Sequence, residues 1–213
     1  MSTRSAEQGE LQAAARVIGL YQRHAEAWAR DRGTRLSEGA WLDDFQALMP
    51  ARGQVLDLGC GAGEPLAATL ARRGYSITGV DSAPAMIAMC RKRLPDQAWL
   101  IADMRTLALG RTFDGLLVWD SFFHLCHDNQ RRMFPIFSRH AHAGAALMFT
   151  SGTSHGESVG AYEGEPLYHA SLDTAEYRAL LGEAGFAVVR HVVEDAACGG
   201  RTVWLARKKG LLF

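Results

Sequence analysis

The run from Val55 to Pro65 holds the residues whose types and spacing carry the most chemistry in this chain. A short apolar strand leads to Asp57, and three alternating glycines follow it before a stretch, 66–73, that favours a helix. A strand, a glycine turn and a helix in this order let a nucleotide-like ligand approach the backbone of an α/β sheet. The run therefore predicts a binding site at the end of a strand.

Two residues of this turn indicate which ligand it suits. A dinucleotide fingerprint reads Gly-x-Gly-x-x-Gly or Ala, and its last residue is small so that helix and strand pack closely. Here Gly59 and Gly61 are followed by Glu64, and Asp57 stands where a pyrophosphate would lie. Both acids disfavour NAD and favour a cationic ligand without phosphate. Glu64 is also explained as a first-turn acid that favours a helix N-terminus.

Acidic residues also follow the next two predicted strands. Asp81 comes about 20 residues after the glycine turn, where a carboxylate can accept hydrogen bonds from both hydroxyls of a ribose. Asp103 ends the strand predicted over 97–102. The alternatives are that Asp81 only caps the helix beginning at Pro84, and that Asp103 is an exposed turn residue.

In these motifs the chain resembles the class I methyltransferases, which use S-adenosyl-L-methionine (SAM). The segment 57–63, Asp-Leu-Gly-Cys-Gly-Ala-Gly, is similar to the first motif of that family, and the later motifs follow in the expected order. The resemblance covers about residues 50–207 and is strongest to small bacterial members. It names no acceptor.

The resemblance implies that SAM binds at the carboxyl ends of the strands and that S-adenosyl-L-homocysteine (SAH) is the product. Asp57 and the glycine-turn amides would orient the amino-acid end, Asp81 the ribose, and Asp103 with Met104 the adenine. Trp119, Phe122 and Phe123 are candidates to face the sulfonium, an aromatic contact worth about 1–2 kcal/mol when desolvated, with ordinary core packing as the alternative for at least one phenylalanine. The predicted cofactor-binding residues are Asp57, Gly59, Cys60, Gly61, Asp81, Ser82, Met86, Asp103, Met104 and Trp119.

The residues after the fourth predicted strand point to the acceptor. We predict that His124 acts as a base with a pKa near 7 for an oxygen or nitrogen acceptor, and that Asp120 orients the acceptor or the cofactor's amino group. A histidine that is merely hydrogen-bonded within the turn is the alternative. Alignment alone can supply about 7–11 kcal/mol of the barrier, so no covalent nucleophile is expected. The predicted substrate contacts are Tyr21, Trp28, Phe123, Tyr168 and His169.

Composition narrows the acceptor class. Lys plus Arg and Asp plus Glu number 23 each, so the formal net charge is zero and gives no long-range attraction for nucleic acid or anionic lipid. Enzymes that methylate exocyclic amines of nucleobases carry a Pro-Pro-aromatic run after the fourth strand, and 119–122 lacks it. We expect a small-molecule acceptor, no nucleic-acid or membrane partner, and a monomer or homodimer.

Cysteine and histidine spacing indicates the compartment and the metal content. The four cysteines form no Cys-x-x-Cys pair, which favours a reducing, cytoplasmic location. Neither a signal peptide nor an apolar run of roughly 20 residues is visible. His124 with His127, and His140 with His142, lack further ligands at useful spacing, so we predict no metal site.

Around these residues the sequence predicts an α/β, Rossmann-like fold. We expect a doubly wound, seven-stranded, mainly parallel sheet with a C-terminal antiparallel hairpin strand and helices on both faces. The last two strands are joined by about seven residues, too few for a parallel crossover. The strands are expected near 54–58, 76–80, 97–102, 113–119, 145–151, 186–193 and 201–207, and the helices near 64–73, 84–93, 128–141 and 173–184.

Two helices, over 6–32 and 38–49, are predicted before the sheet. They give an N-terminal helical cap, 1–50, over one edge of a methyltransferase domain, 51–213, as a single structural unit. The segment 152–172 fits no regular element, and we expect it to be a long substrate loop at the carboxyl edge.

These expectations converge on a SAM-dependent methyltransferase that acts on an oxygen or nitrogen atom of a small molecule. One alternative is a methyltransferase acting on protein or RNA, which predicts a charged concave surface beside the pocket. Another is a non-catalytic, SAM-binding regulatory module. A nicotinamide oxidoreductase is disfavoured by Asp57 and Glu64.

Overall fold

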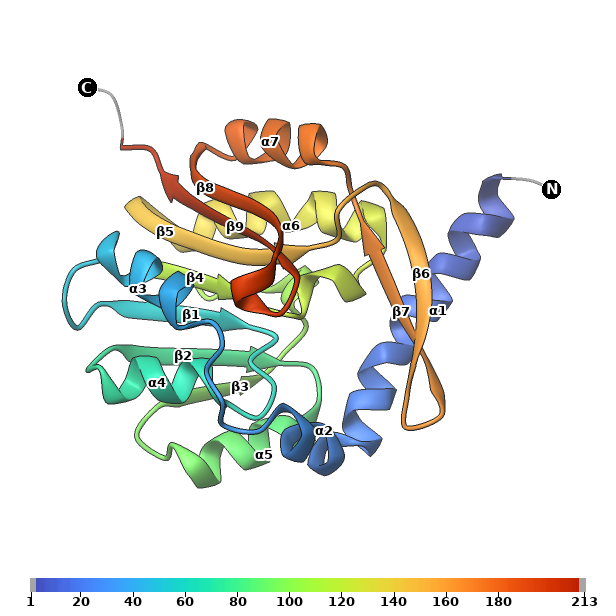
Figure 1. Cartoon of the computed structure of the whole chain (residues 1–213), viewed down its shortest axis with the longest axis horizontal. Helices are drawn as coiled ribbons and strands as arrows, with labels where there is room; N and C mark the ends of the chain where they lie inside the picture. The colour runs from blue at the N-terminus through green and yellow to red at the C-terminus, as the bar shows by residue number, and fades with distance from the viewer. Residues whose placement is uncertain (1–2, 211–213) are drawn as a thin grey trace.

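The computed structural model describes residues 3–210, and side chains from residue 12 onward. In it, seven strands form one sheet in the order β3-β2-β1-β4-β5-β9-β8 (Figure 1). The pairs from β3 to β5 are parallel, and β9 is antiparallel to both β5 and β8. The predicted sheet and its antiparallel hairpin strand are therefore confirmed. The strands are β1 Gln54–Leu58, β2 Ser76–Asp81, β3 Ala98–Ile101, β4 Phe113–Val118, β5 Ala141–Ser151, β8 Phe186–Asp195 and β9 Arg201–Lys208.

The chain order reverses between the central strands β1 and β4. From β1 the sheet grows through β2 to β3 on one side, and from β4 through β5 on the other. In open α/β sheets a ligand binds outside the carboxyl ends of the strands at such a switch point. The topology thus brings the ends of β1, β2 and β4 to one place.

Alternation along the buried strands separates two cores. Leu116 and Val118 of β4 pack on one face, in the core that holds Phe134 and Phe149. Leu117 packs on the other face, in the core that holds Trp41 and Phe45. Helices cover both faces, as predicted: α3 Gly39–Ala47, α4 Leu66–Arg72, α5 Pro84–Arg93, α6 His127–His140 and α7 Thr174–Glu183.

The single helix predicted over 6–32 is two helices, α1 Thr3–Arg23 and α2 Ala25–Arg32. The chain breaks at His24, whose φ of −107° and ψ of 21° lie outside the helical range. Figure 1 shows α1 across the end of the sheet toward which β1 and β2 point. The second predicted helix, α3, packs into a face of the sheet through Trp41 and Phe45 instead of capping its edge. Of the predicted N-terminal helices, α1 and α2 therefore cover the carboxyl end of the sheet, not an edge of it.

The expectation of an irregular loop over 152–172 was wrong. This segment forms a two-stranded antiparallel sheet of β6 Gly156–Tyr162 and β7 Glu165–Ser171. Its turn is Glu163-Gly164, with φ of 49° and 78°, as a two-residue hairpin turn requires. Most of β6 is exposed while β7 lies against α1 (Figure 1), so the hydrophobic alternation that marks a strand is weak.

Among the described residues, we find no helix with the length and apolar character that a membrane crossing requires.

Candidate functional site

One cavity lies at the carboxyl ends of β1, β2 and β4, under α1 and α2, with an empty volume of about 1000 Å³ that includes space open to solvent. The structure brings all ten predicted cofactor-binding residues to its wall: Asp57, Gly59, Cys60, Gly61, Asp81, Ser82, Met86, Asp103, Met104 and Trp119. Their roles in binding remain predictions.

The glycine turn is shaped by backbone that other residues rarely adopt. Gly59 and Gly61 have φ of 74° and 52°, in the left-handed region. A Cβ on Gly59 would lie 2.3 Å from the Cβ of Ser121, and one on Gly61 would lie 3.0 Å from the ring of Trp28. The turn is thus held between β4 and α2, and α2 covers it.

Two carboxylates, the buried Asp57 and the half-buried Asp81, face this cavity without a cationic partner among the described residues. Asp57 is only 5% exposed, and among the described residues no group donates a hydrogen bond to its carboxylate. Burial, with a contribution from the charge of Asp81, raises the pKa of Asp57 to about 7. Asp81 accepts from the N–H groups of Gly61 at 3.0 Å and Ala83 at 2.9 Å, yet burial still raises its pKa. A cationic group in the cavity would stabilise the charged form of both carboxylates and lower both pKa values again.

Asp103, at the end of β3, is held by a residue that sequence reasoning missed. The guanidinium of Arg105 donates to both carboxylate oxygens, with Nε at 2.9 Å from each and Nη2 at 2.5 Å from Oδ2. Burial alone would raise the pKa of Asp103, but Arg105 holds it below its usual value. Arg105 also lines the cavity. A lone arginine in a short turn gives no sequence signal.

The aromatic residues around the end of β4 separate into different surroundings. Trp119 lines the cavity and is 6% exposed, and its indole N–H has no partner among the described residues. Phe122 is fully buried against Phe134 and Phe149 and belongs to the core. Phe123 lines a second cavity. Phe122 is therefore excluded as a ligand contact.

His124 is placed at the cavity but is not the near-neutral base that the sequence predicted. Its Nδ1–H donates to the carbonyl of Tyr168 at 2.9 Å, and its Nε2 accepts from the hydroxyl of Tyr21 at 2.9 Å. Burial lowers the pKa of His124 to about 3, so the ring is neutral at physiological pH. Burial also raises the pKa of Tyr21, as do the charges of Asp120 and Asp81.

A second cavity adjoins the first. The two share Tyr21, Trp28, Arg32, Asp120 and His124 as a common wall. Of the other predicted substrate contacts, Phe123 and His169 line the second cavity, whereas Tyr168 lines neither and is 2% exposed. The remaining lining residues are Asp31, Tyr162, Leu167, Gly199 and Arg201.

Asp120 stands where the two cavities meet, in a backbone conformation that is unusual for aspartate. Its φ is 47°, and its N–H donates to Oγ1 of Thr150 at 2.9 Å. Arg201 of β9 donates to its carboxylate through Nε at 3.0 and 2.9 Å, and Nη2 lies 2.8 Å from Oδ2. Strained residues persist where their surroundings hold them firmly, often at functional sites. Arg201 was not predicted as a site residue, because its place in the last strand does not show that it pairs with Asp120, 81 residues earlier in the chain.

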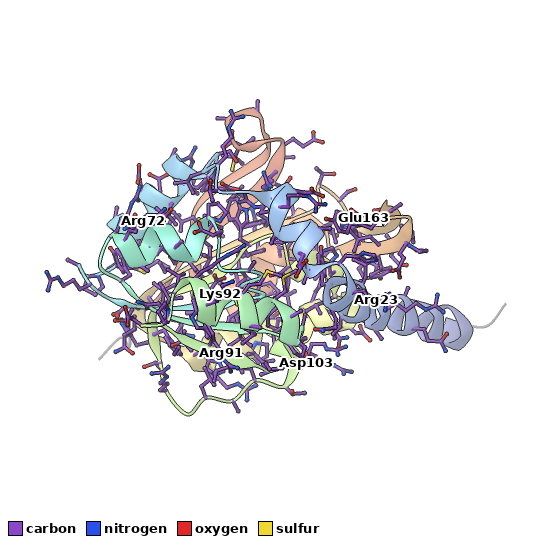
Figure 2. The ribbon with its side chains drawn as sticks, turned by 90° about the horizontal axis from the view of Figure 1, so that it is seen from below. Arg23, Arg72, Arg91, Lys92, Asp103 and Glu163 are labelled. Atoms are coloured by element: carbon purple, nitrogen blue, oxygen red, sulfur yellow. The ribbon has the colours of Figure 1, made fainter. Side chains whose placement is uncertain are left out.

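Polar contacts fasten the hairpin to the helices that cover the cavities. Glu165 of β7 accepts from Nε of Arg23 at 3.0 Å and forms an ion pair with His24 at 2.6 Å. The hydroxyl of Tyr162 donates to Asp31 at 2.9 Å. Figure 2 shows Arg23 on α1 and Glu163 at the hairpin turn at the same end of the molecule.

Metal ligands do not gather here. Within residues 3–210, no group of three or more His, Cys, Asp or Glu side chains is arranged to hold a metal ion.

Known proteins are similar to this chain in part of its sequence and in its fold. Residues 55–144 match the model of a family described as a methyltransferase domain. The chain is 32% identical over 78 residues to the putative methyltransferase YqeM of Bacillus subtilis, covering 35% of this chain and 30% of that protein. It is 31% identical over 102 residues to magnesium-protoporphyrin O-methyltransferase of Rhodobacter capsulatus, covering 46% and 44%. The chain thus spans less than half the length of these curated relatives.

A solved structure extends the likeness to the whole fold. The SAM-bound amino pentose methyltransferase CalS10 from Micromonospora echinaspora superposes with a TM-score of 0.68 at 22% identity, over 86% of this chain and 96% of that one. The two chains thus share one fold.

Proposed function

We propose that this protein is a SAM-dependent methyltransferase of small molecules. The premises are that residues 55–144 belong to the methyltransferase domain family and that the chain has the class I methyltransferase fold. The observation that carries the proposal is the first cavity. It gathers every residue that the family motifs predict for the cofactor, from four different strand ends.

The residues present suit SAM in charge and in shape. A sulfonium and an ammonium are cations, and the cavity offers Asp57, which is buried, and Asp81, which is half-buried. Neither has a cationic partner within the described chain. The left-handed glycines remove the side chains that would fill the cradle. When bound, SAM supplies an activated methyl group and a neutral leaving group, so the protein needs no nucleophile of its own.

Each residue then has a definite task. We assign Asp57 to the amino-acid end, Asp81 to the ribose hydroxyls, and Met104 with Asp103 to the adenine. Arg105 already occupies both oxygens of Asp103, so an adenine amine would share that carboxylate or displace the guanidinium. Trp28 and Tyr21 close the cavity from α2 and α1, which excludes water from the reacting atoms.

The second cavity is where we place the acceptor. It opens beside the first and meets it at Asp120 and His124, the end at which the family brings the methyl group. The names of the porphyrin and amino pentose enzymes indicate small-molecule acceptors, which supports a small acceptor here. His124, being neutral, is suited to hold Tyr21 in place more than to remove a proton.

Two other functions are less well supported. A non-catalytic module that only binds SAM needs no second cavity beside the reactive end, and this chain has one. An RNA methyltransferase should present cations at the site. Figure 2 shows Arg91 and Lys92 on α5, but carboxylates outnumber guanidiniums on the walls of the two cavities.

Calorimetry with SAH tests the proposal. We expect the wild type to bind SAH, and Asp81→Ala to bind roughly tenfold to a hundredfold more weakly, because two hydrogen bonds to a charged acceptor are lost. The matched control is Asp43→Ala, which removes an exposed carboxylate of α3 that pairs with Arg73. This variant should bind SAH as the wild type does. Failure of the wild type to bind SAH would overturn the proposal.

A further inference from the structure

The walls of the two cavities carry more negative than positive groups. Six carboxylates line them: Asp31, Asp57, Glu64, Asp81, Asp103 and Asp120. Three guanidiniums line them: Arg32, Arg105 and Arg201. The whole chain has a formal net charge of zero, so this surplus is local to the site.

Each of the three guanidiniums already has a protein carboxylate. Arg105 pairs with Asp103 at 2.5 Å and Arg201 with Asp120 at 2.8 Å. Arg32 pairs at 2.5 Å with Glu38, which is fully buried. A carboxylate acceptor would have to take one of these cations from its partner and leave a desolvated charge behind, which is costly. The site is thus electrostatically unsuited to a carboxylate acceptor.

The wall that the two cavities share is equally unsuited to a hydroxyl acceptor. A hydroxyl must lose its proton as it is methylated, so it needs a base within reach. The Nε2 lone pair of His124 is occupied by the Tyr21 hydroxyl, and burial lowers the pKa of this histidine to about 3. Asp120 is held in the fork of Arg201. His169 lines the second cavity only and is not part of the shared wall.

We propose that the acceptor is a small primary or secondary amine whose nitrogen is recognised by Asp120 where the two cavities meet. The inference rests on the methyltransferase function proposed above. An amine needs neither a free guanidinium nor a base in the transfer step, and its N–H groups can donate to the carboxylate oxygens that Arg201 holds in place.

The transfer step balances without a proton acceptor. The lone pair of the neutral amine forms the N–C bond while the S–C bond breaks and leaves its electron pair on sulfur. The positive charge therefore moves to nitrogen, beside Asp120, which stabilises it as it develops. An amine that arrives as an ammonium ion first gives its proton to water in the open second cavity, and the methylated product releases its proton to solvent in the same way.

The second cavity also limits the carbon skeleton. Phe123, Leu167 and Trp28 contribute apolar side chains to its lining, together with the charged pair of Asp120 and Arg201. A ring or short chain bearing one amine fits this division. Benzylamine, benzyl alcohol and benzoate are therefore matched probes, because they differ in the reacting group and little in the skeleton.

The experiment uses the wild-type protein saturated with SAH and detects binding of each probe at millimolar concentration by saturation-transfer NMR. We expect saturation transfer to benzylamine and none to benzoate or benzyl alcohol. With methyl-labelled SAM, label should enter benzylamine alone. Preference for benzoate or benzyl alcohol, or the absence of any benzylamine signal, would overturn the inference.

The variant Asp120→Asn adds a second test, in which the preference between a cationic and an anionic probe should reverse. It should weaken benzylamine binding by roughly tenfold or more and permit benzoate binding, because Arg201 is left without its carboxylate. Asp43→Asn, far from both cavities on α3, is the matched control. Unchanged benzylamine affinity in Asp120→Asn contradicts the role of Asp120. If Asp120→Asn fails to fold, the wild-type probe set decides the question alone.

The two proposals fail differently. If the wild-type protein does not bind SAH, the proposed methyltransferase function itself is contradicted. Wild-type protein that binds SAH but prefers benzoate leaves that function standing and removes only the amine.

Discussion

At the scale of single residues, the site depends on carboxylates that are buried before any ligand arrives. Asp57 has a pKa raised to about 7 by burial and by Asp81, so a large share of it is protonated at neutral pH. An ammonium group beside it would favour the charged form and lower that pKa again. Ligand binding and loss of the Asp57 proton are therefore coupled.

This coupling predicts proton release when SAH binds near pH 7. Titrations in buffers of different ionisation enthalpy should give different apparent binding heats, and affinity should rise with pH up to about 7 and then level off. Asp57→Asn should remove the buffer dependence. Equal heats in all buffers for the wild type would show that Asp57 does not meet the ammonium.

Motif residues of this site were predictable because they follow strand ends at set spacings. Asp57, Asp81 and Asp103 could be placed at one edge of the sheet from the strand pattern alone. Their chemical state could not, because it depends on distant partners. Arg201 lies 81 residues from Asp120, and the hydroxyl of Tyr21 lies 103 residues from His124.

At the scale of elements, the β6–β7 hairpin supports the helices that close the site. Its contacts to α1 pass through Glu165, which is bound by Arg23 and His24. We call these contacts of Glu165 with Arg23 and His24 the clamp. Since exposed ion pairs contribute only about 0–1 kcal/mol, the clamp should affect local mobility more than overall stability.

Glu165→Gln should therefore increase hydrogen exchange over 156–171 and speed SAH dissociation while changing the melting temperature little. Exchange mass spectrometry and stopped-flow measurement of the dissociation rate check this. Glu163→Gln, at the hairpin turn, is the matched control, and it should behave as the wild type does. An unchanged exchange pattern in Glu165→Gln would show that the clamp does not hold the hairpin.

The β6–β7 hairpin and the helix break at His24 are the two features of the fold that could not be predicted from the sequence. Five consecutive residues of β6 are exposed, so both of its faces meet solvent, and it carries small or polar residues at most positions; burial therefore imposes no strong alternation on it. The helical periodicity of 6–32 continues across His24, because Val17 and Ile18 of α1 and Trp28 of α2 all face the first cavity. The parallel strands, buried on both faces, gave the clearest pattern.

At the scale of the whole molecule, the buried histidine should affect how stability depends on acid. His124 has a folded pKa of about 3, against an ordinary value of 6.5. Between these values the unfolded chain binds a proton that the folded protein does not. Stability therefore falls as pH falls through this window, by about 1.4 kcal/mol per pH unit at most.

Comparing the wild type with His124→Gln isolates this contribution. Glutamine can donate and accept as the neutral ring does, but it does not titrate. Denaturant unfolding from pH 7 to pH 4 should show the wild type losing stability faster than the variant. Parallel curves would mean that His124 is not buried in its neutral form.

The central claim is that the cavity under α1 and α2 holds the adenosyl cofactor. A crystal structure of the protein with SAH tests it most directly. We predict one SAH in that cavity, with its ribose hydroxyls on Asp81 and its amino group beside Asp57. An empty cavity at saturating SAH, or SAH bound elsewhere, would contradict the account.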